Sequence, residues 1–164
     1  MKLKDKNLFK NIKLIVLDFD GVMTDNFVYT SENGEEFVAC WRGDGIGVSN
    51  IKKLGILITV LSTERNPVVT KRCEKLKIDC IQGCDNKIRA LKDLIIKLKI
   101  SMSEVLYMGN DVNDYDCLEQ VGTPVIVADA HHDVIPLAKY VTNAYGGKGA
   151  VREVCDLIVK YNKI

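Results

Sequence analysis

Short apolar runs alternate with amphipathic segments along the chain. Residues 13–19 form a continuous apolar run of the kind that makes a strand buried on both faces. Similar runs predict strands at 56–61, 78–81, 105–108, 125–127 and 140–142. Apolar residues at helical spacing predict helices at 45–54, 67–76 and 86–99, and a last helix from about residue 150. Strands that alternate with helices predict an α/β fold in which helices flank a central parallel sheet.

One segment departs from this alternation. Residues 27–29 and 36–41 are rich in aromatic and β-branched side chains, and Asn33-Gly34 lies between them. Asn-Gly is a strong signal for a tight turn between antiparallel strands. We therefore predict a β-hairpin insertion at residues 26–41.

Two of the predicted strands end in polar, acidic clusters. Asp18 and Asp20 follow the first strand, and Asn110 and Asp111 follow the strand at 105–108. Ligands of open α/β sheets bind beyond the carboxyl ends of the strands, so these clusters are expected to meet if both strands are central. Crowded carboxylates need a cation between them, and hard oxygen ligands favour Mg²⁺.

The same edge of the sheet has the groups that phosphoryl transfer requires. A carboxylate can attack a negative phosphoryl group only when the charge is screened, which a metal ion does. Other donors must hold the remaining phosphoryl oxygens. Ser62, after the strand at 56–61, and Lys87, at the start of a helix, are placed to do so.

Composition and charge exclude several other classes. The net charge of +1 gives no basic field for nucleic acid, and the longest apolar runs, such as 56–61, are too short to span a membrane. Most of the six cysteines lie in apolar patterns, which favours free thiols and a cytoplasmic protein.

Four motifs, in this order, resemble those of the haloacid dehalogenase (HAD) superfamily: Asp18-Phe19-Asp20-Gly21-Val22 with Thr24-Asp25, then Ser62, then Lys87, then Gly109-Asn110-Asp111 with Asp114. Within it the chain is similar to the capless phosphatases of 2-keto-3-deoxy sugar acids. The short length, the hairpin at 26–41 and the glycine-rich segment 146–153 carry this resemblance. It implies one Rossmann-like HAD domain over residues 1–164, with no cap domain. It also implies a homotetramer built through the hairpin, and a glycine-rich segment that acts as a lid.

The resemblance also implies roles for individual residues. Asp18 is expected to attack phosphorus, and Asp20 to protonate the leaving oxygen and then activate water. Asp18 and the backbone carbonyl of Asp20 are expected to bind Mg²⁺ together with Asn110 or Asp111. Ser62 and Lys87 complete the catalytic set. The residues expected to contact substrate, some of them across a subunit boundary, are Gly21, Thr24, Glu64, Arg72 and Lys75.

One position departs from the family pattern. These phosphatases usually have Gly-Asp-Asp in the fourth motif, and this chain has Gly109-Asn110-Asp111. An amide oxygen can bind Mg²⁺ but adds no charge. The same asparagine resembles the phosphatase-like domains fused to sialic-acid cytidylyltransferases.

Two functions therefore remain open at the level of the sequence. The first is Mg²⁺-dependent hydrolysis of a sugar acid phosphate, either 3-deoxy-D-manno-octulosonate 8-phosphate (KDO 8-phosphate) or a nine-carbon sialic-type 9-phosphate. The second is a weakly active or non-catalytic oligomerisation domain associated with a cytidylyltransferase. A phosphotransferase or mutase is disfavoured, because no cap would keep water from an aspartyl-phosphate.

Overall fold

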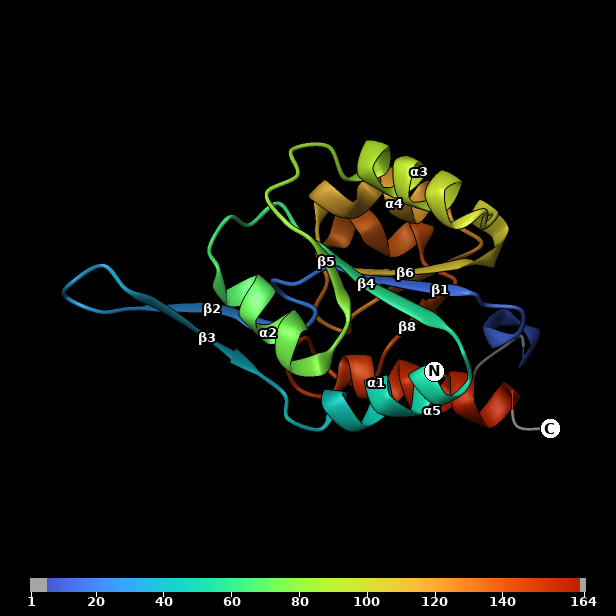
Figure 1. Ribbon diagram of the computed structural model, residues 1–164, viewed down its shortest axis with the longest axis horizontal. Helices are drawn as coiled ribbons and strands as arrows, with labels where there is room; N and C mark the ends of the chain where they lie inside the picture. The colour runs from blue at the N-terminus through green and yellow to red at the C-terminus, as the bar shows by residue number, and fades with distance from the viewer. Residues whose placement is uncertain (1–5, 163–164) are drawn as a thin grey trace.

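A parallel sheet of six strands forms the centre of the computed structural model, which describes residues 6–162 (Figure 1). The strand order is β5-β4-β1-β6-β7-β8, and every pair is parallel. The strands are β1 (Leu14–Leu17), β4 (Leu57–Leu61), β5 (Asp79–Ile81), β6 (Val105–Gly109), β7 (Thr123–Ile126) and β8 (Tyr140–Val141). The predicted α/β fold with a parallel sheet is confirmed. The first five and last two residues of the predicted domain, 1–5 and 163–164, lie outside the described residues.

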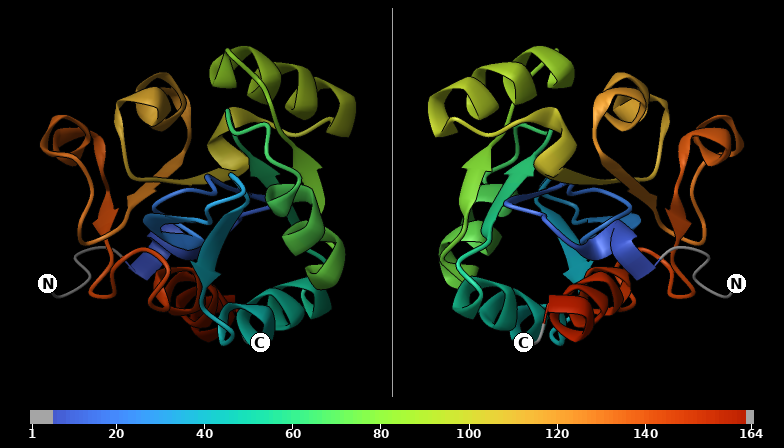
Figure 2. Two further views of the ribbon diagram at one scale, coloured as in Figure 1. Left: turned by 90° about the vertical axis from the view of Figure 1, so that its left-hand side faces the viewer. Right: turned by 90° about the vertical axis from the view of Figure 1, so that its right-hand side faces the viewer.

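Helices cover both faces of the sheet (Figures 1 and 2). The helices are α1 (Asp44–Lys53), α2 (Val68–Leu76), α3 (Lys87–Leu98), α4 (Tyr115–Gln120) and α5 (Ala150–Asn162). Short 3-10 helices are η1 (Lys6–Phe9), η2 (Met102–Glu104), η3 (Val112–Asp114) and η4 (His132–Leu137).

Strand β1 shows why its sequence is apolar throughout. Ile15 and Leu17 belong to the core under α1 and α5, whereas Leu14 and Val16 belong to the core under α3 and α4. Both faces of the strand are therefore buried, and no polar position alternates with the apolar ones. This central position also places the end of β1, with Asp18, between β4 and β6.

The predicted hairpin is confirmed. Strands β2 (Thr24–Thr30) and β3 (Glu36–Cys40) pair antiparallel and form a separate two-stranded sheet. Figure 1 shows this hairpin projecting away from the body of the protein. Its side chains Phe27, Val28, Tyr29 and Phe37 are exposed, whereas Val38 and Cys40 are partly buried against the core under α1 and α5.

Helix α4 is an element that the sequence pattern did not predict. With six residues it makes fewer than two turns, which is too short for an apolar face to repeat.

Among residues 6–162, the structure shows no helix long and apolar enough to cross a membrane. All six cysteines are free thiols.

Candidate active site

The carboxyl ends of β1, β4 and β6 meet in one small polar pocket. The Asp18 N–H donates to the carbonyl of Met108 at 2.9 Å, which fixes the end of β1 against β6. The pocket has a volume of about 90 Å³ and is lined by Asp18, Asp20, Asn26, Ser62, Thr63, Asn110, Asp111 and Asn113. Five of the predicted site residues, Asp18, Asp20, Ser62, Asn110 and Asp111, are therefore brought together.

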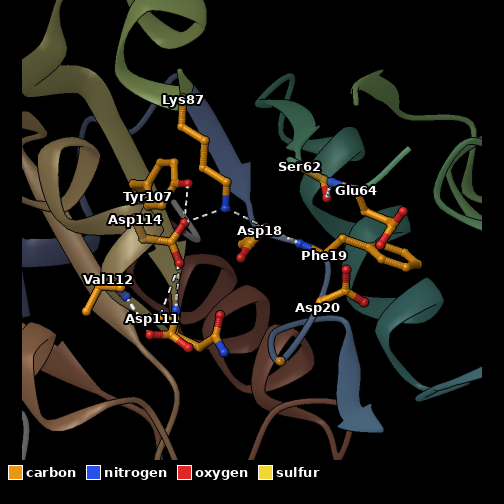
Figure 3. Close-up of polar contacts among 12 residues, drawn as sticks. Asp18, Phe19, Asp20, Ser62, Glu64, Lys87, Tyr107, Asp111, Val112 and Asp114 are labelled. Carbon is orange, nitrogen blue, oxygen red and sulfur yellow. Dashed lines mark hydrogen bonds and ion pairs between the residues drawn. The ribbon is translucent and has the colours of Figure 1, made fainter. Parts of the chain in front are cut away.

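Lys87 lies beneath this pocket between two buried carboxylates (Figure 3). Its Nζ is 2.8 Å from Asp18 Oδ1 and 2.7 Å from Asp114 Oδ1, and the exposed fraction of the Lys87 side chain is 2%. Two of the three ammonium donors are thereby used, which leaves one for a bound anion. A lysine so deeply buried is found only when paired.

Asp114 organises this arrangement from the loop after β6. Its Oδ1 accepts a hydrogen bond from the hydroxyl of Tyr107 at 2.7 Å, in addition to the one from Lys87. Its Oδ2 accepts the backbone N–H of Asn110 at 2.9 Å. Asp114 belongs to the fourth motif but has no role predicted from the sequence, and Tyr107 is not among the predicted site residues. The signal for Asp114 was its place four residues after Asn110, whereas Tyr107 lies in an apolar strand that hides its hydroxyl.

Burial is the largest single influence on the pKa of Asp18 and on that of Lys87. Burial raises the pKa of Asp18 to about 7, and the charge of Asp114 adds to this rise while Lys87 opposes it. Burial alone would lower the pKa of Lys87, but the charges of Asp18 and Asp114 outweigh it and raise that pKa. Lys87 is therefore a fixed positive charge paired with Asp18, which lines the pocket.

Asp20 occupies a more open position than Asp18. It is partly buried, and burial raises the pKa of its carboxyl, with the charge of Glu64 as the next contribution. A carboxyl with a raised pKa is suited to hold and release a proton. Burial thus raises the pKa of both carboxyls, and what separates them is position: Asp18 is buried and paired with Lys87, whereas Asp20 is only partly buried.

Thr24 supports Asp20 from below. Its Oγ1 donates to Asp20 Oδ1 at 3.5 Å and accepts the N–H of Gly21 at 3.1 Å, and the side chain is fully buried. It has no surface to offer a substrate, so we propose that Thr24 positions Asp20, in place of the predicted substrate contact. Gly21, also buried, has a φ of +74°, and a Cβ there would lie 2.0 Å from Asn110 Nδ2. Gly21 is needed for this close approach of the two loops.

The oxygen atoms of the pocket suit a hard cation. Asn110 Oδ1 is buried and accepts no hydrogen bond from the described residues. The side chain of Asp111 caps η3 instead, where its Oδ1 accepts the N–H of Val112 at 2.7 Å. An orphaned amide oxygen close to two carboxylates is what an oxygen-coordinated divalent cation would satisfy. The residues present therefore fit a metal site, with Asn110 better placed than Asp111 to contribute.

The other predicted substrate residues lie outside this pocket. Glu64 Oε1 accepts the N–H groups of Arg65 and Asn66 at the mouth. Arg72 and Lys75 instead line a separate groove of about 650 Å³, hereafter the basic groove. Its lining residues are Cys40, Arg42, Gly45, Ser49, Lys52, Lys53, Arg72, Lys75, Leu76 and Lys77, with six cations and no carboxylate. Arg72 Nε is buried there with no partner among the described residues.

The glycine-rich segment packs against the loop after β1. The N–H of Gly147 donates to the carbonyl of Val22 at 3.0 Å, and the N–H of Gly146 donates to Asp129 Oδ1 at 3.0 Å. The segment is thus docked on the loop after β1, and its expected role as a lid stays a prediction.

Comparison with known proteins gives one consistent result. The family described as haloacid dehalogenase-like hydrolase matches residues 52–154. The 3-deoxy-D-manno-octulosonate 8-phosphate phosphatase KdsC of Salmonella typhi is 43% identical over 151 residues, which span 92% of this chain and 80% of the relative. The KdsC of Escherichia coli K12 matches with the same identity and coverage.

Solved structures agree with these relatives. The 3-deoxy-D-manno-octulosonate 8-phosphate phosphatase of Yersinia pestis has a TM-score of 0.92 and 38% identity, covering 95% of this chain and 85% of its own. That of Moraxella catarrhalis, in complex with a magnesium ion, a phosphate ion and a KDO molecule, has a TM-score of 0.92 and 34% identity. The match covers 95% of this chain and 90% of the Moraxella chain. A cobalt-bound phosphatase from Haemophilus influenzae has a TM-score of 0.89 and 32% identity. The match covers 94% of this chain and 91% of the Haemophilus chain.

Proposed function

The chain belongs to the haloacid dehalogenase-like hydrolase family and is a phosphatase of that family, and on this premise we propose that it hydrolyses KDO 8-phosphate with the aid of Mg²⁺. The observation that carries the proposal is the pocket itself. Asp18 is paired with the buried Lys87, and Asp20 and the orphaned Asn110 oxygen line the same space. The substrate is that of the relatives that share most of this chain.

Asp18 and Asp20 divide the reaction between them. An Asp18 oxygen attacks phosphorus, the bond from phosphorus to the sugar oxygen breaks, and an aspartyl-phosphate forms. Asp20 gives its proton to the departing sugar oxygen. It then takes a proton from water, which attacks the aspartyl-phosphate and releases inorganic phosphate. The raised pKa of Asp20 suits both steps.

Lys87 and Ser62 hold the phosphoryl oxygens. Lys87 has one ammonium donor left after its bonds to Asp18 and Asp114, and this donor is fixed before substrate arrives. The Ser62 hydroxyl lies on the opposite side of Asp18 in Figure 3 and accepts the N–H of Glu64 at 3.0 Å, so its own hydrogen remains available.

The residues Asp18, Asp20 through its carbonyl, and Asn110 would hold Mg²⁺. The bound ion would reduce the repulsion between the attacking carboxylate and the anionic phosphoryl group. Among the relatives, one structure contains magnesium and another cobalt, which supports a divalent metal at this site.

We further propose that the basic groove binds the carboxylate of a sugar acid bound to a neighbouring copy. Arg72 and Lys75 line that groove and not the pocket of their own chain, which favours service to the pocket of a neighbouring copy, as the family resemblance implies. Guanidinium and ammonium groups without carboxylate partners are suited to an anionic ligand.

The substrate is tested by kcat/KM with Mg²⁺ for KDO 8-phosphate and for nine-carbon sialic-type 9-phosphates. We expect KDO 8-phosphate to be preferred. Preference for a nine-carbon substrate would replace the proposed substrate, and no turnover of either would favour the non-catalytic oligomerisation domain.

The groove is tested with Lys75→Ala and its control Lys71→Ala. Lys71 is on the same helix but pairs with Glu74 at 3.1 Å and does not line the groove. Lys75→Ala should raise KM for sugar acid phosphates and leave KM for p-nitrophenyl phosphate, which has no carboxylate, unchanged. Equal effects of the two variants would contradict the assignment.

A further inference from the structure

Two glycines far along the chain touch the loop that carries Asp20. A Cβ at Gly146 would lie 1.9 Å from the carbonyl oxygen of Gly21, and a Cβ at Gly147 would lie 2.3 Å from the backbone nitrogen of Asp25. The two backbones are therefore in direct contact with no side chain between them. The N–H of Gly147 also bonds the carbonyl of Val22 at 3.0 Å. A shift of Gly146 or Gly147 toward the loop after β1 would displace that loop, and a shift away would break the Gly147–Val22 hydrogen bond.

That loop sets the position of Asp20 through Thr24. The backbone of Thr24 lies directly under Gly147, where an added Cβ would be 2.4 Å from its carbonyl carbon. The Thr24 hydroxyl donates to Asp20 Oδ1 at 3.5 Å, and it also accepts the N–H groups of Gly21 and Asn26. The contact with Gly147 thus restrains the backbone of Thr24, the residue whose hydroxyl orients the Asp20 carboxylate.

Glu153, on α5, holds the residues just before Gly146. Its carboxylate accepts the backbone N–H of Asn143 at 3.0 Å, the Asn143 side-chain amide at 2.9 Å and the N–H of Ala144 at 2.9 Å. It also accepts the hydroxyl of Tyr140 at 2.7 Å. Burial raises the pKa of Glu153, but these hydrogen bonds outweigh it and lower that pKa, so the group is an ionised, four-fold acceptor.

Asp129 is the second anchor. Its Oδ1 accepts the N–H of Gly146 at 3.0 Å, from the loop after β7. Glycine backbone has wide conformational freedom, and Gly147 has a φ of +61°, so hydrogen bonds to both sides of the segment help to hold it in place. Glu153 holds the backbone just before the two glycines, at residues 143–144, and Asp129 holds the N–H of Gly146 itself.

We propose that Glu153 and Asp129 are positioning residues for Asp20, acting through the backbone contact of Gly146 and Gly147 with the loop after β1. The inference rests on the proposed function only in taking Asp20 as the general acid. It assigns a task to two carboxylates that do not line the phosphoryl pocket.

A misplaced general acid has a specific kinetic signature. Breaking the ester bond leaves charge on the departing oxygen, and Asp20 neutralises that charge by donating a proton. A good leaving group such as p-nitrophenolate needs little help, whereas the more basic phenolate or a sugar alkoxide needs more. Loss of positioning should therefore lower kcat/KM for phenyl phosphate more than for p-nitrophenyl phosphate. The ratio of the two values does not depend on how much of the enzyme is folded.

The experiment measures this ratio for the wild type, Glu153→Gln, Asp129→Ala and the control Asp156→Asn. Asp156 is on the same helix as Glu153 but pairs with Arg152 at 2.8 Å. Glu153→Gln keeps the size of the side chain and replaces one acceptor oxygen with a donor. Because general acids contribute about 10²–10⁴-fold, we expect the ratio to shift by at least about tenfold in Glu153→Gln and Asp129→Ala. We expect no shift in Asp156→Asn.

Asp20→Asn, measured alongside, separates two kinds of failure. If Asp20→Asn leaves the ratio unchanged, or if the wild type hydrolyses no phosphate ester, the proposed role of Asp20 is wrong and the positioning inference falls with it. If Asp20→Asn shifts the ratio and neither Glu153→Gln nor Asp129→Ala does, the proposed function stands and the positioning inference is overturned.

Discussion

At the scale of single residues, Lys87 is the group on which the site most depends. It separates Asp18 from Asp114 and is almost entirely buried. Replacing it with an apolar residue leaves two buried carboxylates without a cation. Removing one partner of a buried ion pair costs about 3–5 kcal/mol, because the remaining charge stays desolvated.

We therefore expect Lys87→Met to lower the free energy of unfolding by about that amount and to lower kcat at least about 100-fold. Urea unfolding and steady-state rates measure the two effects. Lys92→Met, an exposed position on the same helix, is the control. Wild-type stability together with wild-type turnover in Lys87→Met would show that the pair is not part of the mechanism.

Asn110 is the residue that distinguishes this site from an all-aspartate one. Its Oδ1 is the orphaned atom, so it is placed to bind the metal without adding charge. We expect Asn110→Asp to tighten Mg²⁺ binding and to raise activity most at low Mg²⁺, because affinity for hard cations depends on ligand charge. A Mg²⁺ titration of activity tests this.

Asp111→Asn is the matched variant for that titration. Asp111 lies beside Asn110 but caps η3, so its loss should change the metal dependence less. If Asp111→Asn is the damaging change and Asn110→Asp is not, Asp111 is the ligand. If neither alters the metal dependence, the metal is on a different loop.

The sequence predicted this site well where chemistry follows a strand end. Asp18, Asp20, Ser62 and Asn110 each come directly after a buried strand, and the sheet topology brings them together. Other features could not be predicted because they depend on tertiary packing. The contact of Gly146 with Gly21 joins positions 125 residues apart by number (146 − 21), and the hydroxyl of Tyr107 is invisible within an apolar strand.

At the scale of elements, the junction of α1 and α5 contains a carboxylate that catalysis does not use. Asp44 is 1% exposed and accepts the N–H of Arg152 at 3.0 Å. Burial raises its pKa from 3.8 to about 6, despite that hydrogen bond and nearby arginines. Between these two pH values the folded state binds more protons than the unfolded state. Stability from this group is therefore greatest at about pH 4 and is lost as the pH rises through 6.

Asp44→Asn should remove this pH dependence. The amide is neutral at every pH and its oxygen can still accept the Arg152 N–H. The variant should thus gain roughly 2–3 kcal/mol relative to wild type between pH 4 and 7, as two pKa units correspond to that order of free energy. Chemical unfolding across this range provides the measurement, with the exposed Asp93→Asn of α3 as control. A difference that stays constant with pH would refute the account of Asp44.

Element positions were the most predictable part of the fold. Strands and longer helices followed from apolar runs and from local signals such as Asn86, whose side chain caps α3 by accepting the Arg89 N–H. The short α4 and the 3-10 helices η1, η2 and η3 were missed because they span too few residues for a repeating pattern. Local sequence cannot place them, whereas packing against the sheet can.

At the scale of the whole molecule, the hairpin is the feature a single chain does not explain. Phe27, Tyr29, Phe37 and Trp41 are 66%, 58%, 56% and 48% exposed. A two-stranded sheet is marginally stable alone, and exposed aromatic side chains on it are suited to an interface. We propose that the hairpins of four copies pack together, as the family resemblance implies. This assembly would also bring the basic groove of one copy toward the pocket of another.

We expect light scattering at micromolar concentration to give the mass of a tetramer. Phe27→Ser should shift the protein toward smaller species, because it removes exposed apolar surface from the hairpin. Ile96→Ser is the control, since Ile96 is 74% exposed on α3, away from the hairpin. A monomeric wild type would rule out the proposed assembly.

The most direct test of the whole account is the turnover of Asp18→Asn. The substitution keeps the size of the side chain and removes the attacking carboxylate, and thermal unfolding would verify that the variant is folded. The account predicts no measurable phosphate release above background from KDO 8-phosphate or p-nitrophenyl phosphate at saturating Mg²⁺. Release at a near wild-type rate from folded Asp18→Asn would contradict it.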